Sequence, residues 1–225
     1  MSVNKLNEEE IKESVEKLIS NADNLTEESA ILFQAAKYAR AFTLSHLARE
    51  ELSKVVMLMA LDGKLKSNLQ IDWNSFWKRF RNHKAKITNS EIWLLSMSGL
   101  NSSVVSIEMV DSYAKALNDL KNNSLYVSHN EQGVLDPAEV INEDKARISI
   151  LSARLLFELL RDMWINHQKM DWESASTVKE EIRHYMNIVE QGSVEEIRSL
   201  YDFTLSSAHG LLKIINSGRD EHHQL

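Results

Sequence analysis

The stretch that decides the fold is residues 26–61, TEESAILFQAAKYARAFTLSHLAREELSKVVMLMAL. Apolar side chains fall on nearly every side of a helix drawn through it, and it contains neither glycine nor proline. A helix that is apolar all round is buried among other elements. The stretch therefore predicts a central helix that opens at Thr26-Glu27-Glu28 and runs to about Leu61.

Composition extends this prediction to the whole chain. The 225 residues include only six glycines and one proline, whereas sheets and long loops need those residues at their turns. Apolar residues make up 43% of the chain, which is enough for a hydrophobic core and too many for intrinsic disorder. We therefore predict an all-α protein, with one large domain or a core that carries an appendage.

Further helices are indicated on both sides of the central one by apolar spacing and capping residues. They are a short helix after Asn7, then Asp72 to Ile87, Asn89 to Ser124, Asn142 to His167, and the pair 174–191 and 193–216 separated by Gly192. Residues 125–137 are the one substantial loop between them. We predict a helical bundle over residues 1–170, a C-terminal helical hairpin packed on it over 171–217, and a flexible tail over 218–225.

Several classes of protein are excluded by what the chain lacks. It has no cysteine, so disulfides, zinc–thiolate sites, iron–sulfur clusters and cysteine nucleophiles are ruled out. The longest apolar run, Val55 to Leu61, is far shorter than the roughly 20 residues of a membrane span, and the first ten residues are too acidic for a signal peptide. We expect a cytoplasmic protein that does not interact with membranes.

The net charge of −7 repels nucleic acid, so any RNA contact requires a local basic patch. Residues 78–86, KRFRNHKAK, provide one with five positive charges. On a continuous helix, Arg79, His83 and Lys86 share one edge of the apolar face. Two neighbouring cations disfavour a protonated imidazole, so His83 is expected to be able to accept a proton at pH 7.

Metal-free RNA cleavage needs such a base for the 2′-hydroxyl, an acid for the leaving 5′-oxygen, and cations for the phosphorane. The alternative interpretation of residues 78–86 is a solvated basic helix face. The sequence pattern leaves both open.

Charged residues within the central helix form a second candidate. Glu50, Glu51 and Lys54 lie where few charges are tolerated, and Glu50 and Lys54 have the spacing of a favourable ion pair. Both a half-buried ion pair and a functional site would explain them. Lys121 and Tyr126, at the end of the 89–124 helix, either bind phosphate or cap and pack the helix end.

Arg161 and His167 are six positions apart, as are Arg40 and His46. On a helix this spacing leaves the two side chains about 120° apart, so they converge only at a helix end or across a dimer. His167 also falls on the apolar face of its helix, which favours a hydrogen-bonded core histidine.

Glu181-x-x-His184 has the ligand spacing of di-iron bundles. A di-iron site needs a second copy of the motif on a facing helix, and we find none. We therefore predict no metal and no cofactor.

Three segments, in this order, resemble the AbiV family of bacterial abortive infection proteins, within the HEPN superfamily of helical domains. They are Tyr38-Ala39-Arg40-Ala41 leading to Glu50-Glu51-Leu52-Ser53-Lys54, then residues 76–86, then residues 120–127 followed by Pro137. The resemblance spans about residues 26–165 and leaves the C-terminal hairpin outside. It implies a HEPN helical bundle, usually dimeric, that acts in phage defence.

Many HEPN proteins are metal-independent endoribonucleases with an arginine followed four to six residues later by a histidine. Where related domains carry that motif, this chain has Lys121 and Tyr126, so His83 is expected to supply the acid–base group. With the resemblance we assign catalytic roles to His83, Arg79, Lys86, Lys121 and Tyr126, RNA binding to Arg81, Lys78, Lys84 and Asn122, and support to Glu50, Glu51 and Lys54. Arg161 and His167 are the alternative catalytic pair.

The resemblance therefore implies a homodimeric ribonuclease that stays dormant until a phage-encoded activator engages it, and then cleaves tRNA or rRNA and arrests translation. The alternative is a non-catalytic module that binds phage or host translation machinery, which the acidic surface and the altered motif favour. A third hypothesis is a helical accessory domain for a nucleotidyltransferase partner.

Overall fold

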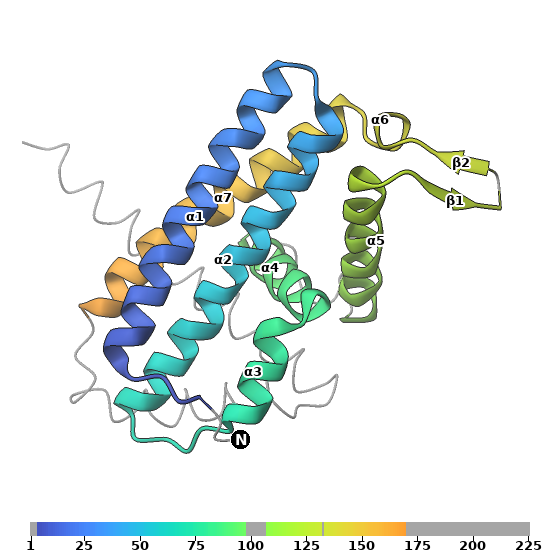
Figure 1. Cartoon of the computed structure of the whole chain (residues 1–225). Coiled ribbons are helices and arrows are strands. Elements are labelled where there is room, and N and C mark those ends of the chain that lie inside the picture. The colour runs from blue at the N-terminus through green and yellow to red at the C-terminus, as the bar shows by residue number, and fades with distance from the viewer. Residues whose placement is uncertain (1–3, 98–106, 132, 170–225) are drawn as a thin grey trace, which may run out of the picture.

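The computed structural model describes residues 4–97, 107–131 and 133–169, and this part of the chain is almost entirely helical (Figure 1). Its elements are α1 (Glu8–Gln34), α2 (Tyr38–Lys66), α3 (Trp73–Arg81), α4 (His83–Met97), α5 (Ile107–Leu125), β1 (Ser128–Asn130), β2 (Gly133–Leu135), α6 (Pro137–Val140) and α7 (Glu143–Gln168). The predicted all-α fold class is confirmed. None of the helices described here is both long enough and apolar enough to cross a lipid bilayer.

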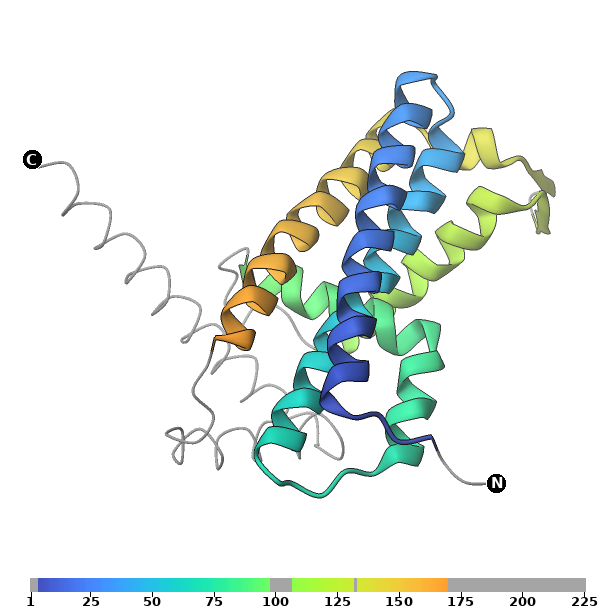
Figure 2. The same cartoon turned by 60° about the vertical axis from the view of Figure 1, so that its left-hand side comes forward.

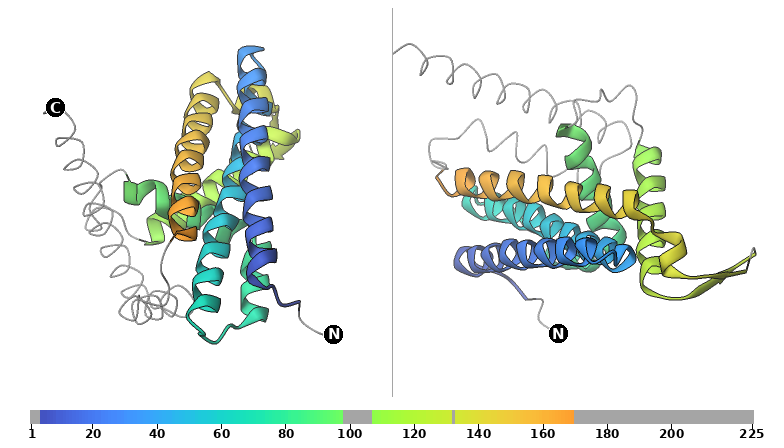
Figure 3. Two further views of the ribbon diagram at one scale, coloured as in Figure 1. Left: turned by 90° about the vertical axis from the view of Figure 1, so that its left-hand side faces the viewer. Right: turned by 90° about the horizontal axis from the view of Figure 1, so that it is seen from above.

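The three longest helices, α1, α2 and α7, lie side by side (Figure 2). α2 packs against α1 and α7, and also against α4 and α5. Seen from above in Figure 3, α1, α2 and α7 run alongside one another and α5 crosses them. α2 carries buried residues from Ala39 to Lys64, as predicted for a central helix that other elements surround.

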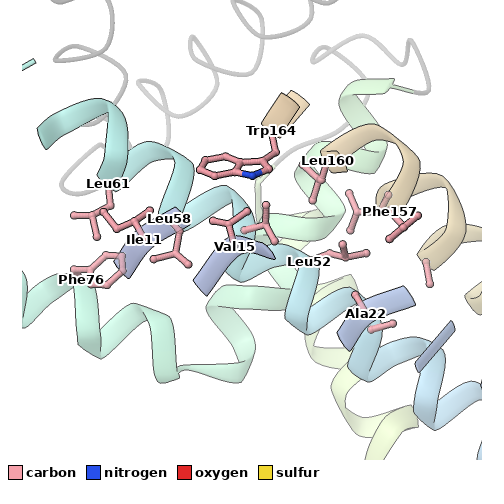
Figure 4. Close-up of a cluster of buried hydrophobic side chains, with 14 residues drawn as sticks. Ile11, Val15, Ala22, Leu52, Leu58, Leu61, Phe76, Phe157, Leu160 and Trp164 are labelled. Atoms are coloured by element: carbon pink, nitrogen blue, oxygen red, sulfur yellow. The ribbon is translucent and has the colours of Figure 1, made fainter. Parts of the chain in front are cut away.

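The main hydrophobic core lies where α1, α2, α3 and α7 meet (Figure 4). Its large buried side chains are Ile11, Val15, Leu52, Val55, Leu58, Leu61, Phe76, Leu156, Phe157, Leu160 and Trp164. A smaller cluster joins Ile87 on α4 to Ala114 and Leu117 on α5. This second cluster holds α4 and α5 together beside α2.

The boundary between the first two helices differs from the prediction. Thr26 lies inside α1, buried, and its hydroxyl donates a hydrogen bond to the Ala22 carbonyl at 2.7 Å. The chain turns instead at Ala36, whose φ of +54° is left-handed. Thr-Glu-Glu matches the pattern of a helix start, but a threonine hydroxyl also bonds back to the carbonyl four residues earlier within a helix.

The predicted helix from Asp72 to Ile87 is in fact two helices. Asp72 caps α3 as expected and accepts hydrogen bonds from the N–H groups of Asn74 and Ser75 at 3.0 and 3.1 Å. Asn82 is then extended, with ψ of 115°, and its side chain accepts the N–H of Ala85 at 3.1 Å. Asparagine favours such capping geometry over a helix interior, so α4 starts at His83.

The predicted helix from Asn89 to Ser124 is also wrong. Asn89 lies inside α4, and its amide donates to the Ser53 carbonyl on α2 at 3.3 Å. α4 and α5 are separate helices that pack against each other, which one straight helix does not allow.

The predicted loop at 125–137 contains the β1–β2 hairpin, in which Ser128 pairs with Leu135. Asn142 caps α7 as predicted and accepts the N–H of Lys145 at 3.0 Å. The predicted C-terminal hairpin at 171–217, the tail at 218–225 and the Glu181-x-x-His184 pattern lie outside the described residues. The domain division therefore stays a prediction.

Candidate functional site

A buried carboxylate on α2 forms the centre of the candidate site. Glu50 is 3% exposed. Its Oε2 lies 2.6 Å from His83 Nδ1 and 2.9 Å from Lys86 Nζ, both on α4. Its Oε1 accepts a hydrogen bond from Lys121 Nζ on α5 at 3.1 Å. We call these four residues the Glu50 cluster.

The break at Asn82 explains how α4 reaches this carboxylate. His83 and Lys86 lie three positions apart in the first turn of α4, and therefore share one face of the helix. Because Asn82 is extended, α4 takes its own direction and does not continue the axis of α3 (Figure 1).

A hydrogen bond between α5 and α2 positions Lys121 next to Glu50. One turn later on α5, the buried Ser124 hydroxyl bonds to the hydroxyl of Thr43 on α2 at 2.7 Å. Lys121 and Ser124 thus face α2 together, and α5 brings the second ammonium group to Glu50.

The cluster holds Glu50 in its charged form. Burial on its own would raise the pKa of Glu50, but hydrogen bonds from Lys86 and His83 and the charges of both lysines lower that pKa to about 2. Two ammonium groups share one carboxylate, with side chains only 6% and 9% exposed. Positive charge is therefore concentrated below the surface at this point.

His83 lies at the solvent-facing side of the cluster, with its side chain 60% exposed. A carboxylate only accepts hydrogen bonds, so a neutral His83 donates Nδ1–H to Glu50. The bond to one ring nitrogen fixes the tautomer, which leaves Nε2 with a lone pair that can take a proton. The arrangement is that of an imidazole base oriented by a carboxylate.

Two predictions about this region are corrected by the structure. Arg79 lies on α3 and His83 on α4, so they do not share one helix edge, and the group that contacts His83 is a carboxylate rather than a pair of cations. The expected pair of Glu50 and Lys54 is also wrong. Lys54 Nζ donates to Glu51 at 2.5 Å and lies 5.8 Å from the ring centroid of Phe80.

Through Lys54 and Phe80, the Glu51–Lys54 pair on α2 thus contacts α3. The supporting role expected of the two residues stays a prediction. Glu50 itself belongs to the centre of the cluster and not to its surroundings.

The remaining predicted residues do not belong to the cluster. In the described part of the chain none of them is a partner of Glu50: Arg79, Lys78, Arg81, Lys84, Asn122 and Tyr126. Arg81 lies over the Trp77 ring at 5.6 Å, and Tyr126 is 66% exposed beyond the end of α5.

The alternative pair, Arg161 and His167, does not converge within the chain. His167 Nε2 lies 2.7 Å from Asp62 Oδ2, and its ring stacks on Trp164. The prediction of a hydrogen-bonded core histidine is confirmed. Arg161 is a surface residue that pairs with Glu158 at 2.6 Å.

The structure adds two buried residues that sequence analysis did not select. His46 is 1% exposed, and its Nε2 lies 3.7 Å from Glu50 Oε1. Arg49 is 4% exposed, and burial lowers its pKa to about 10, so it keeps its charge at pH 7. The four-residue spacing of His46 and Glu50 is the signal that could have identified His46.

Acid is expected to destabilise the protein through His46. Burial, followed by the charge of Arg49, lowers the pKa of His46 from 6.5 to about 3. Between pH 6.5 and about pH 3, His46 is therefore protonated in the unfolded chain but neutral in the folded protein. The free energy of unfolding falls as the pH drops through this range, by up to about 1.4 kcal/mol per pH unit. When the free energy of unfolding is measured by urea denaturation between pH 7 and pH 4, it should depend less steeply on pH in His46→Gln than in the wild-type chain.

The exposed His129 provides the control for this experiment. His129→Gln should keep the pH dependence of the wild-type chain. If the free energy of unfolding changed equally with pH in His46→Gln and in the wild type, the result would contradict a buried, neutral His46 imidazole.

Metal binding has no support at this centre. Both carboxylate oxygens of Glu50 already accept hydrogen bonds or ion pairs from cationic groups, with which a metal ion would compete. Among the described residues no three histidine, aspartate or glutamate side chains gather in a way that could hold a metal ion.

Comparison with known proteins identifies a family. No curated protein and no solved structure matches the chain. The family model described as AbiV, a HEPN family, matches residues 10–158. The match covers well over half of the chain and includes all four residues of the Glu50 cluster. This protein therefore belongs to the AbiV family of HEPN proteins.

Proposed function

We propose that the protein is an abortive infection effector that arrests translation by cleaving RNA without a metal ion. Membership of the AbiV family implies a HEPN-type role in phage defence. The observation that supports the finer proposal is the exposed His83 imidazole, held 2.6 Å from Glu50 above two buried lysines.

In this proposal the cluster supplies the base and the cations for RNA transesterification, and a second copy of the chain supplies the acid. Nε2 of His83 takes the proton of a ribose 2′-hydroxyl, and the resulting oxygen attacks the adjacent phosphorus. The bond to the 5′-oxygen breaks, which leaves a 2′,3′-cyclic phosphate and a 5′-hydroxyl. In the proposed homodimer, a protonated His83 of the second copy returns a proton to that 5′-oxygen.

The cations take two roles in this proposal. Lys86 and Lys121 are too buried to contact a phosphate directly. Their positive charges instead stabilise, by electrostatic attraction, the negative charge that develops on the phosphoryl oxygens in the transition state. The predicted RNA-binding residues contact the RNA backbone in this proposal. They are Lys78, Arg79, Arg81 and Lys84 near His83 in the sequence, and Asn122 and Tyr126 near Lys121.

The proposal also includes a phage-encoded activator, tRNA or rRNA as substrate, and a cytoplasmic location. Arg161 and His167 remain the alternative catalytic pair, and they can meet only across a two-fold axis. That alternative is the weaker one because His167 is already bonded to Asp62.

A second candidate function, a non-catalytic module that blocks translation by binding, has one observation in its favour. By the resemblance, Lys121 stands where related HEPN domains carry the arginine of the motif, and its ammonium group is buried against Glu50 rather than presented to a phosphate.

The integrity of RNA in arrested cells separates the two functions. Bacteria that produce the chain are infected with a phage whose growth it blocks, and total RNA is analysed on denaturing gels while protein synthesis is followed by pulse labelling. If the protein is a ribonuclease, tRNA or rRNA fragments with 2′,3′-cyclic phosphate ends should be found before protein synthesis stops. Arrested synthesis with intact RNA would select the binding module.

A further inference from the structure

A buried histidine lies one turn before Glu50 on α2 and takes no part in the hydrogen bonds of the Glu50 cluster. His46 is 1% exposed, and in the described part of the chain neither of its ring nitrogens has a hydrogen-bond partner. An unpaired buried polar group costs free energy. A hydrocarbon ring would avoid that cost, since the ring of Phe42 already stacks on His46. The imidazole nitrogens therefore point to a role other than packing.

His46 approaches the Glu50 oxygen that does not contact His83. Its Nε2 lies 3.7 Å from Oε1, which is beyond hydrogen-bond distance. Among the described residues Oε2 has two close partners, His83 and Lys86, whereas Oε1 has one, Lys121. A carboxylate oxygen can accept a second donor. A shift of about 0.5–1 Å would bring Nε2 to a normal hydrogen-bond distance from Oε1.

His46 acts on Glu50 without adding a charge. Burial, and then the charge of Arg49, lowers the pKa of His46 to about 3, with Glu50 opposing this shift and Lys121 and His83 adding to it. The ring is therefore neutral at pH 7, and it turns an N–H toward the carboxylate, which only accepts hydrogen bonds. A third cation beside Glu50 would lower the affinity of His83 for a proton. A neutral N–H attracts Oε1 with much less of that effect.

We propose that His46 is a positioning residue, which holds the Glu50 carboxylate in the orientation that directs Oε2 at His83. A carboxylate is planar, so a restraint on Oε1 also restrains Oε2. Lys121 reaches Oε1 through a long, flexible side chain, whereas His46 is a ring stacked on Phe42 of the same helix. The role rests on the proposed function, in which His83 is the base, and concerns how that base is oriented.

The tautomer of His83 tests this role because it depends on where Oε2 lies. His46→Phe keeps an aromatic ring beside Phe42 but has no N–H. In nitrogen-15 NMR of the purified chain over a pH titration, a smaller fraction of neutral His83 should be protonated on Nδ1 than in the wild type, since Oε2 no longer stays beside Nδ1. RNA cleavage by this variant should fall by up to about 10²-fold, the cost of misplacing a catalytic group by about 1 Å.

His46→Gln is the matched control, since its side-chain amide supplies an N–H in place of the imidazole. It should bring the fraction of His83 protonated on Nδ1 back near the wild-type value. Ser45→Ala removes a neighbouring buried hydroxyl, which bonds to Ser149 at 2.7 Å, and should lower stability without changing the His83 signal. His46→Leu repeats the test with a smaller side chain if His46→Phe does not fold.

A wild-type tautomer of His83 in the folded variant that lacks the N–H, His46→Phe or His46→Leu, would overturn the positioning role. An equal loss of Nδ1 protonation in His46→Gln would also overturn it, because packing rather than the N–H would then be responsible. The NMR measurement needs no RNA. A wild-type chain that cleaves no RNA would therefore contradict the proposed function, while the tautomers would still decide the role of His46.

Discussion

Glu50→Ala is expected to lower the free energy of unfolding by about 3–5 kcal/mol. The substitution removes the carboxylate and leaves Lys86 and Lys121 buried together without it. Breaking a buried ion pair from one side costs this much because the remaining charge has lost its partner in a poorly solvated place. Urea denaturation at pH 7, followed by circular dichroism, measures the change.

Glu51→Ala is the matched control, one position along the same helix. Glu51 and Lys54 are each about one-fifth exposed, so the loss of that pair should cost no more than about 1 kcal/mol. Stability should return in part when Lys86→Met and Lys121→Met are added to Glu50→Ala, since the buried charges are then gone. Equal losses for Glu50→Ala and Glu51→Ala would show that the cluster is not a buried ion network.

His83→Ala is expected to reduce RNA cleavage about 10²- to 10⁴-fold, the usual contribution of a general acid or base. Its effect on stability should be small because the side chain is 60% exposed. The fraction of cleaved RNA is measured by primer extension at fixed times after infection, and phage plating is scored on the same cells. The variant should lose both cleavage and protection.

His129→Ala is the control for this loss. His129 is an exposed histidine on β1, away from Glu50, and its substitution should leave cleavage and protection as in the wild-type chain. Undiminished cleavage by His83→Ala would remove His83 from the mechanism and favour the pair of Arg161 and His167.

The fold was predictable from the sequence where one local signal decided the structure. The all-round apolar pattern identified α2, and the side chains of Asn7, Asp72 and Asn142 marked the starts of their helices. The errors came where one residue allows two structures. Thr26 forms a back bond inside a helix, and Asn82 ends one helix while it caps the next.

The four residues of the Glu50 cluster could be selected from the sequence, but their arrangement could not. His83, Lys86, Lys121 and Glu50 were each selected by type and position, yet Glu50 contacts residues 33 and 71 positions away. Such contacts depend on where α4 and α5 lie against α2, which helical periodicity does not reveal. The break at Asn82 also placed Arg79 on another helix than His83, while Lys86 stays on the same face and the carboxylate of Glu50 contacts both.

The most direct test of the account is the tautomer of the His83 ring. Nitrogen-15 NMR of the imidazoles over a pH titration, with His83→Ala to assign the signal, reports which ring nitrogen carries the proton when the ring is neutral. The hydrogen bond to Glu50 predicts protonated Nδ1 and a lone pair on Nε2, with a shift toward the other tautomer in Glu50→Ala, which removes the acceptor. A neutral His83 protonated on Nε2, with the same spectrum in Glu50→Ala, would contradict the carboxylate-oriented base.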